Sequence, residues 1–172
     1  MIRKIITYPN PILKKQSSDI INFDESLWGL LDDMFETMKS RDGIGLASIQ
    51  IAKPWSVFMI NLVDEEGLQK DENLVEYVNP KILSSSGTTT YQEGCLSVPG
   101  FYEDIKRADK IEVEYFNRFG EKQFENLDGL GAIAFQHEFD HLQGKLFIEK
   151  LSFLKRKKFE KEWKKQLKNK KF

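Results

Sequence analysis

The stretch "DGLGAIAFQHEFDHLQG" (residues 128–144) contains both histidines of this 172-residue chain. It predicts a helix that Asp128 caps at its start and that Gly144 ends, because these residue types favour those positions. At about 100° per residue, His137 and His141 lie on one face, one turn apart, so both imidazoles can bind one metal ion. Glu138 projects to the side, where it can act on a water molecule at that ion.

Two ordinary histidines on a half-buried helix are the alternative interpretation. The residues before them are apolar and predict that the helix is embedded in the core: Leu130, Ile133, Ala134 and Phe135. Buried, closely spaced imidazoles need polar partners. We therefore favour the metal site.

A catalytic site of the zinc type usually has three protein ligands, so a third ligand must come from elsewhere in the chain. Cys95 in "YQEGCLSVPG" (residues 91–100) offers a thiolate, and Gly94 beside it leaves room for close backbone approach. Glu160 is the other candidate, but the lysines around it indicate a solvated helix face. A single cysteine is also often just a small buried apolar residue.

The rest of the chain predicts a fold of the α+β class. Helical spacing of apolar residues predicts an N-terminal helix from about Glu25 to Arg41, capped by Asp24. Four runs are strand-like: residues 56–63, 74–82, 110–117 and 121–127. In the third run, Ile111, Val113 and Tyr115 alternate with glutamates, which predicts one buried face. Strands and helices do not alternate one for one, so we expect an α+β fold with largely antiparallel β-sheets rather than a doubly wound α/β fold.

Length and composition predict one domain spanning residues 1–172. We see no apolar run of about 20 residues and no secretory signal, and the one cysteine cannot form an intramolecular disulfide. These features favour a cytoplasmic protein without a membrane partner. The net charge of −1 is unevenly distributed: residues 145–172 contain twelve Lys and Arg against three Asp and Glu, a charge of +9.

That basic segment predicts an amphipathic C-terminal helix from about residue 152 to 172, capped by Ser152. On a helical wheel, the apolar residues share an arc of about 120° opposite the lysines: Phe153, Phe159, Trp163 and Leu167. The basic face is either a solvated surface over a docked helix or a binding surface for RNA.

Three motifs together resemble the signature motifs of bacterial peptide deformylases, in the same order and with the same spacing. They are "GIGLASIQ" (residues 43–50), "EGCLS" (93–97) and "QHEFDH" (136–141), and the resemblance covers nearly the whole chain. It implies a metal-dependent hydrolase that removes the N-formyl group from the initiator methionine of new polypeptides. It also implies an α+β fold in which the HExxH helix packs against antiparallel strands.

The resemblance also implies roles for individual residues. Cys95, His137 and His141 would be the metal ligands, and Glu138 the acid and base. Gln50 and the backbone N–H of Leu96 would bind the oxyanion. The expected substrate-binding residues are Gly45 and Gly94, through close backbone contact, and Ile44, Tyr91, Leu130 and Ile133, which would form an apolar slot for methionine. The resemblance suggests Fe(II), for which Ni, Co or Zn could substitute. Expected partners are N-formylmethionyl peptides and, through the C-terminal helix, the ribosome, but not DNA.

Some positions depart from the usual family pattern. The hydroxyl of Ser48 needs a partner if it is buried. Phe101 and Tyr102 stand in a stretch where many members have an arginine, which puts substrate contacts there in doubt. Arg107 is expected to pair with Glu93 or Asp140, or to form an ordinary surface ion pair.

Two other functions are compatible with parts of this pattern. A protease with Glu160 as its third ligand would cleave internal peptide bonds. A ribosome- or RNA-binding module without enzymatic activity would rely on the basic C-terminal segment.

Overall fold

The computed structural model describes residues 1–169 of the chain. Within them lie three α-helices: α1 (Glu25–Ser40), α2 (Gly129–Leu142) and α3 (Phe153–Asn169). The strands are β1 (Gly45–Ala47), β2 (Val57–Ile60), β3 (Val75–Ser86), β4 (Thr89–Cys95), β5 (Val98–Arg107), β6 (Lys110–Phe116) and β7 (Lys122–Asp128). Short 3-10 turns cover Pro11–Lys14, Ser48–Ile51, Asp71–Asn73 and Phe147–Lys150.

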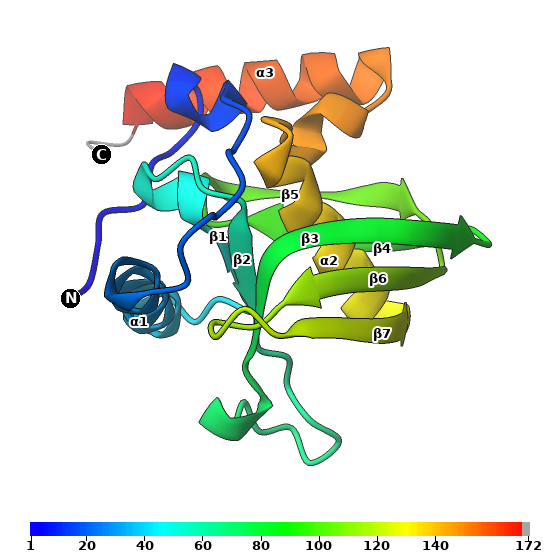
Figure 1. The fold of residues 1–172 in the computed structure, drawn as a ribbon. Coiled ribbons are helices and arrows are strands. Elements are labelled where there is room, and N and C mark those ends of the chain that lie inside the picture. The colour runs from blue at the N-terminus through cyan, green and yellow to red at the C-terminus, as the bar shows by residue number, and fades with distance from the viewer. Residues whose placement is uncertain (170–172) are drawn as a thin grey trace.

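The strands form two antiparallel sheets. One has the order β1-β2-β3-β6-β7, with β1 at an edge, and the other is the β4–β5 hairpin. The helix α2 packs against β1, β2, β6 and β7 and runs through the middle of the molecule (Figure 1). The predicted α+β class with antiparallel sheets around the HExxH helix is confirmed.

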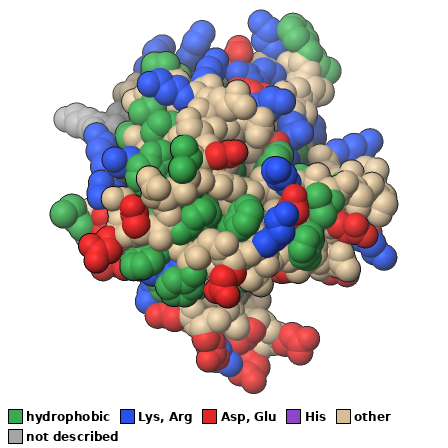
Figure 2. Space-filling view, viewed as in Figure 1, with side chains coloured by type: hydrophobic (Ala, Val, Ile, Leu, Met, Phe, Trp, Pro, Cys, Tyr) green, Lys and Arg blue, Asp and Glu red, His purple; other side chains and the backbone are tan. Residues whose placement is uncertain are grey.

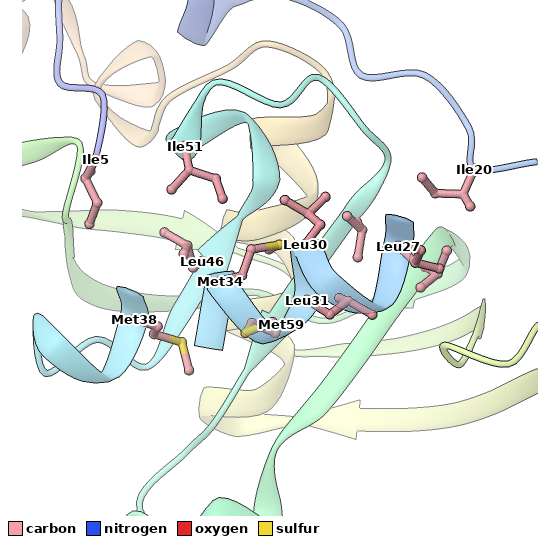
Figure 3. Packing of buried hydrophobic residues seen from close by; sticks show 12 residues of the cluster. Ile5, Ile20, Leu27, Leu30, Leu31, Met34, Met38, Leu46, Ile51 and Met59 are labelled. Carbon is pink, nitrogen blue, oxygen red and sulfur yellow. The ribbon is translucent and has the colours of Figure 1, made fainter. Parts of the chain in front are cut away.

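The N-terminal helix forms where its apolar spacing predicts. The side chain of Asp24 accepts a hydrogen bond from the N–H of Ser26, which caps α1. The apolar face of α1 is fully or almost fully buried against β1 and β2: Leu27, Leu30, Leu31, Met34 and Met38. Figure 3 shows this packing around Leu46 and Met59. This core holds β1 in place beside the candidate site.

The predicted strands in the second half of the chain are also confirmed. In β6, Ile111, Val113 and Tyr115 are buried while the glutamates between them face outward. The strands β6 and β7 pair through a turn at residues 117–120, where Gly120 has a φ of 80°.

The sequence pattern did not predict β1, β4 or β5 as regular strands. In β4, the side chains on the inner face include Glu93 and Cys95, so the strand lacks the apolar alternation that marks a buried face. The polar residues of the candidate site therefore remove the alternation by which β4 could have been recognised in the sequence.

The start of α2 differs from the prediction. Asp128 occupies the N-cap position, but its side chain makes no capping hydrogen bond. The backbone turns at Gly129, where φ is 53°. The helix ends close to the predicted Gly144, whose φ is 75°.

The C-terminal helix is docked on the core, but less of it is buried than its helical wheel suggests. The Oγ of Ser152 accepts a hydrogen bond from the N–H of Lys155, as the capping prediction requires. Phe159 and Trp163 are buried against aromatic residues that include Tyr8. Phe153 and Leu167 remain 75% and 48% exposed, because only the middle of α3 meets this core. The predicted end of this helix, residues 170–172, lies outside the described residues.

Charge is separated along the molecule. The basic α3 lies at one end, and the acidic segment that joins β2 to β3, residues 61–74, lies at the other (Figures 1 and 2).

None of the helices within residues 1–169 combines the length and the apolar character needed to cross a membrane.

Candidate active site

Three side chains predicted as metal ligands converge between β4 and α2. Cys95 ends β4, and His137 and His141 follow one another on the buried face of α2. Their donor atoms all lie within 4.8 Å of one another, and the Sγ of Cys95 is 3.5 Å from the Nε2 of His141. One sulfur and two imidazole nitrogens form a donor set suited to a divalent transition metal.

A chain of buried ion pairs orients His137. Its Nδ1 lies 2.8 Å from the Oε1 of Glu93, which leaves Nε2 to face the cluster. Arg107 donates to both carboxylate oxygens of Glu93, over 2.7 and 2.8 Å, and to Asp140 over 2.7 Å. The predicted pairing of Arg107 is confirmed with both partners, and it links β4, β5 and α2.

The sequence pattern did not predict the contact between Glu93 and His137. Metal-binding histidines commonly pair their second ring nitrogen with a carboxylate, so a glutamate two residues before the candidate Cys95 was the available signal. Burial tends to raise the pKa of Glu93, but hydrogen bonds from Arg107 and His137 outweigh burial and hold this pKa below its ordinary value. Glu93 therefore stays ionised beside His137.

Glu138 lies beside the cluster and is itself buried. Its Oε1 is 3.9 Å from the Nε2 of His137. Within residues 1–169, its Oε2 has no hydrogen-bond partner. Burial raises the pKa of Glu138 to about 7, against the lowering effect of His137. A carboxyl group with a pKa near neutrality can both accept and donate a proton at physiological pH.

Gly45 makes room for Glu138. A Cβ atom added to Gly45 would lie 2.9 Å from the Oε1 of Glu138. Two residues earlier, a Cβ atom added to Gly43 would lie 3.0 Å from the Cδ1 of Leu96. The sequence suggested only backbone contacts for Gly45, whereas the structure shows that its missing side chain also sets the position of the carboxylate.

Gln50 is buried, and its amide is held at both ends. Its Oε1 accepts a hydrogen bond from the N–H of Ala47 over 2.9 Å. Its Nε2 donates to the Oγ of Ser97 over 3.0 Å and lies 3.6 Å from the Sγ of Cys95. The amide donor therefore points to the cysteine end of the cluster, next to Leu96.

The residues predicted to form the methionine slot come from three segments. Ile44 precedes β1, Tyr91 lies on β4, and Leu130 and Ile133 lie on α2. Ile44 and Tyr91 are 38% and 44% exposed, while Ile133 is buried. Their assembly into a slot remains a prediction.

The positions that depart from the family pattern lie in different environments. The buried hydroxyl of Ser48 donates to the carbonyl of Trp55 over 2.6 Å, so it has the partner that burial requires. Phe101 is buried in the core beneath α3, whereas Tyr102 is exposed.

The alternative ligand Glu160 lies on α3 and faces solvent, where it pairs with Arg156 over 3.7 Å. In the part of the chain that the structure describes, the cluster of three potential metal ligands consists of Cys95, His137 and His141 and does not include Glu160. The arrangement therefore does not support the ligand set of the alternative protease.

Comparisons with known proteins identify the family of the chain. A sequence model described as polypeptide deformylase matches residues 2–157. The peptide deformylase of Nautilia profundicola is 49% identical over 166 residues, covering 96% of this chain and 95% of the relative. That of Helicobacter pylori strain Shi470 is 52% identical over 166 residues, with the same coverage of both chains.

Solved structures show the same relationship. The crystal structure of a peptide deformylase from Legionella pneumophila superposes with a TM-score of 0.89 at 40% identity, covering 100% of both chains. One from Ehrlichia chaffeensis superposes with a TM-score of 0.87 at 33% identity, also over 100% of both chains. This chain therefore belongs to the polypeptide deformylase family, the enzymes that remove the N-formyl group from new polypeptides.

Proposed function

We propose that Cys95, His137 and His141 hold the divalent metal ion of this deformylase, and that the ion is Fe(II). The convergence of their three donor atoms beside Glu138 is the observation that carries the proposal. When bound, such an ion supplies Lewis acidity and lowers the pKa of a coordinated water toward about 7. Ni, Co or Zn could take the same place, since all of them accept sulfur and imidazole ligands.

Glu138 would move the protons of the reaction. Its buried carboxylate would take a proton from the attacking water and deliver it to the nitrogen of the leaving amine. The Oε2 oxygen supports this role, because a buried carboxylate oxygen without a protein partner is available to a water molecule or a substrate.

Gln50 and the backbone N–H of Leu96 would stabilise the negative charge that develops on the formyl oxygen. The Nε2 of Gln50 is already oriented toward Cys95, so it need not reorganise during the reaction. Each preplaced donor of this kind is typically worth about 3 kcal/mol in the transition state.

The N-formylmethionyl peptide would lie in an extended conformation between β1 and β4. Gly45 and Gly94 would provide its close backbone contacts, as when a peptide adds a strand to a sheet edge. The methionine side chain would enter the apolar slot contributed by Ile44, Tyr91, Leu130 and Ile133.

Three variants test the assignment of the site. Glu138→Ala should retain its metal but lower kcat for formyl-Met-Ala-Ser by about 100-fold or more, because it loses the proton carrier. Cys95→Ser should instead lose metal affinity, because a hydroxyl is a poorer ligand than a thiolate. Glu160→Ala is the matched control and should retain both properties. Metal content and turnover are measured for each variant. Unchanged metal occupancy in Cys95→Ser would refute the role of Cys95 as a ligand.

The identity of the metal can be tested by storage in air. A thiolate next to Fe(II) in a site open to water is exposed to oxidation. The iron form should therefore lose activity in air, while a nickel form of the same protein should keep it. An iron form that is stable in air would indicate another native metal.

We further propose that residues 1–172 form one catalytic domain that works in the cytoplasm and reaches the ribosome through its basic C-terminal helix. Phe159 and Trp163 anchor the middle of α3, so its lysines project outward from a fixed base. Such a surface attracts RNA with an affinity that falls steeply with salt, because each neutralised phosphate releases counterions.

Charge reversal tests the ribosome proposal. One variant changes four exposed lysines of α3 to glutamate: Lys157, Lys161, Lys164 and Lys168. The control reverses four exposed lysines outside α3: Lys4, Lys15, Lys81 and Lys110. The first variant should lose cosedimentation with ribosomes at low salt more strongly than the control, and both should turn over short formyl peptides. Equal ribosome binding by the two variants would contradict the proposal and indicate that α3 is only a solvated helix.

A further inference from the structure

The β4–β5 hairpin has an irregularity next to the site. Cys95 pairs with Val98 and Glu93 pairs with Glu103, so one residue of β4 lies opposite four residues of β5, at positions 99–102. Gly100 has a φ of 78° in this bulge. Bulges next to active sites commonly redirect a side chain, and here the redirected residues are Phe101 and Tyr102.

The two aromatic residues of the bulge point to opposite faces of the hairpin. Phe101 is 5% exposed and packs against Phe159 of α3, whereas Tyr102 is 64% exposed. The exposed positions continue along β5 at Asp104 and Lys106, while Ile105 is buried. Tyr102 therefore belongs to the outer face of the hairpin.

The ring of Tyr102 lies directly on Gly94. A Cβ atom added to Gly94 would lie 2.4 Å from the Cε1 and 2.5 Å from the Cδ1 of Tyr102. The backbone next to Cys95 is thus covered on its outer face by an aromatic ring that is still largely open to solvent. No residue with a side chain could occupy position 94 without displacing this ring.

We infer that Tyr102 is a specificity-determining residue that contacts the side chain of the second residue of the substrate. The inference rests on the proposed path of the peptide between β1 and β4. Side chains of an extended peptide alternate between the two faces of a sheet. The proposed slot for methionine includes Tyr91, which by strand alternation shares the face of Glu93, two residues along β4. The next side chain of the peptide would then point to the opposite face, where Tyr102 covers Gly94.

The chemistry of this face selects an aromatic second residue. The open surface of the Tyr102 ring can form an offset or edge-to-face contact with another ring. The exposed side chains of Asp104 and Lys106 lie on the same face, and their opposite charges give an acidic side chain no net attraction to it. Substrates with phenylalanine after methionine should therefore react faster than those with glycine or aspartate.

The experiment compares kcat/KM for formyl-Met-Phe-Ser and formyl-Met-Gly-Ser. The ratio of the two values should fall by about 3- to 10-fold in Tyr102→Ala and should be preserved in Tyr102→Phe. A general loosening of the strand at Gly94 would slow both substrates alike, so the ratio isolates the contact with the second residue. Phe124→Ala is the matched control, since Phe124 is a similarly exposed aromatic residue on β7.

A second variant tests whether the preference between the two kinds of second residue can be reversed. Tyr102→Arg should improve formyl-Met-Asp-Ser relative to formyl-Met-Phe-Ser, because a cation replaces the ring. An unchanged ratio in both Tyr102→Ala and Tyr102→Arg would overturn the inference. Turnover of formyl-Met-Gly-Ser by the wild-type protein reports separately on the proposed site, so failure of the site and failure of the Tyr102 contact give different results.

Discussion

At the scale of single residues, Gly45 lies close enough to Glu138 that an added side chain should disturb the site. In Gly45→Ala, the new Cβ would contact the Oε1 of Glu138 at 2.9 Å and push the carboxylate aside. Because a displacement of about 1 Å can cost about 100-fold in rate, we expect kcat to fall by at least about 10-fold while the fold is retained. Steady-state kinetics and circular dichroism measure the two effects.

Gly29→Ala provides the matched control for this substitution. An added Cβ at Gly29 meets no atom within 4 Å, and the residue lies inside α1. Alanine should therefore leave activity unchanged and stabilise the protein by about 0.5–1 kcal/mol. If Gly45→Ala behaved like Gly29→Ala, the contact with Glu138 would have no catalytic importance.

The buried pair of Glu93 and Arg107 predicts a distinctive dependence of stability on pH. The pKa of Glu93 is held below its ordinary value of 4.5, so the stabilisation from its charge is complete above pH 4.5 and is lost as the pH falls below that value. In Arg107→Met, burial dominates instead and raises this pKa, so stability should decrease as the pH rises above 4.5. The variant should be destabilised by about 3–5 kcal/mol at pH 7 and by less at pH 4.

Urea unfolding of metal-stripped protein at pH 4, 5.5 and 7 measures this difference. Arg118→Met is the control, because Arg118 pairs with Glu76 and Asp32 but its side chain is 26% exposed, compared with 2% for Arg107. Its loss should cost only about 1 kcal/mol. A penalty for Arg107→Met that does not change with pH would contradict the charge argument.

Sequence reasoning identified the residues with distinctive chemistry but not their supports. His137, His141 and Glu138 are recognisable because their spacing has a chemical meaning on a helix. The role of Glu93 depends on the pairing of β4 with β5 and on its contact with α2, which join positions 44 residues apart. Gly45 was missed as a support for the same reason, since its close neighbour Glu138 lies on a different element.

At the scale of elements, the junction after α2 depends on Gly144. Its φ is 75°, and an added Cβ would lie 2.3 Å from the carbonyl oxygen of Lys14. Gly144→Ala should therefore cost more than about 3 kcal/mol, since backbone strain adds to a clash with another main chain. Urea unfolding measures the loss.

Gly67→Ala separates the two contributions. Gly67 has a φ of 80°, but an added Cβ there meets no atom within 4 Å. This variant should lose only about 1–2 kcal/mol, the cost of a left-handed backbone for alanine. Equal losses in the two variants would show that the contact with Lys14 contributes nothing.

The helices were more predictable than the strands that complete the site. Apolar residues at helical spacing fixed α1 within one residue at its end. The strands β4 and β5 have no such signal, because Pro99 and Gly100 interrupt β5 and polar site residues occupy β4. For α3, the wheel overestimated the buried face, because a wheel records direction but not how far the neighbouring core extends along the helix.

At the scale of the whole molecule, metal binding should couple the two sheets. The proposed ligands come from the β4–β5 hairpin and from α2, which packs on the five-stranded sheet. A ligand that binds only the folded state raises its stability. Addition of Ni(II) to metal-stripped protein should therefore raise Tm, and Cys95→Ser should show a much smaller rise. A similar rise in both proteins would place the stabilising ion at another position.

The overall architecture could be predicted from the sequence, because it depends on hydrophobic and charge patterns averaged over many residues. The order of strand-like and helical segments indicated the α+β class, and the charge count located the basic end. The position of Tyr102 could not be predicted, because a bulge that spans residues 99–102 determines the face of the hairpin on which its side chain lies.

The separation of charge between α3 and residues 61–74 gives the molecule an electric dipole moment. With a net charge of −1, the protein as a whole is barely attracted or repelled by a distant polyanion. The dipole nevertheless experiences a torque in the field of a polyanion once the two are within about a Debye length, roughly 8 Å at physiological ionic strength. The protein is therefore turned before it touches such a surface, so that α3 arrives first and the acidic segment trails.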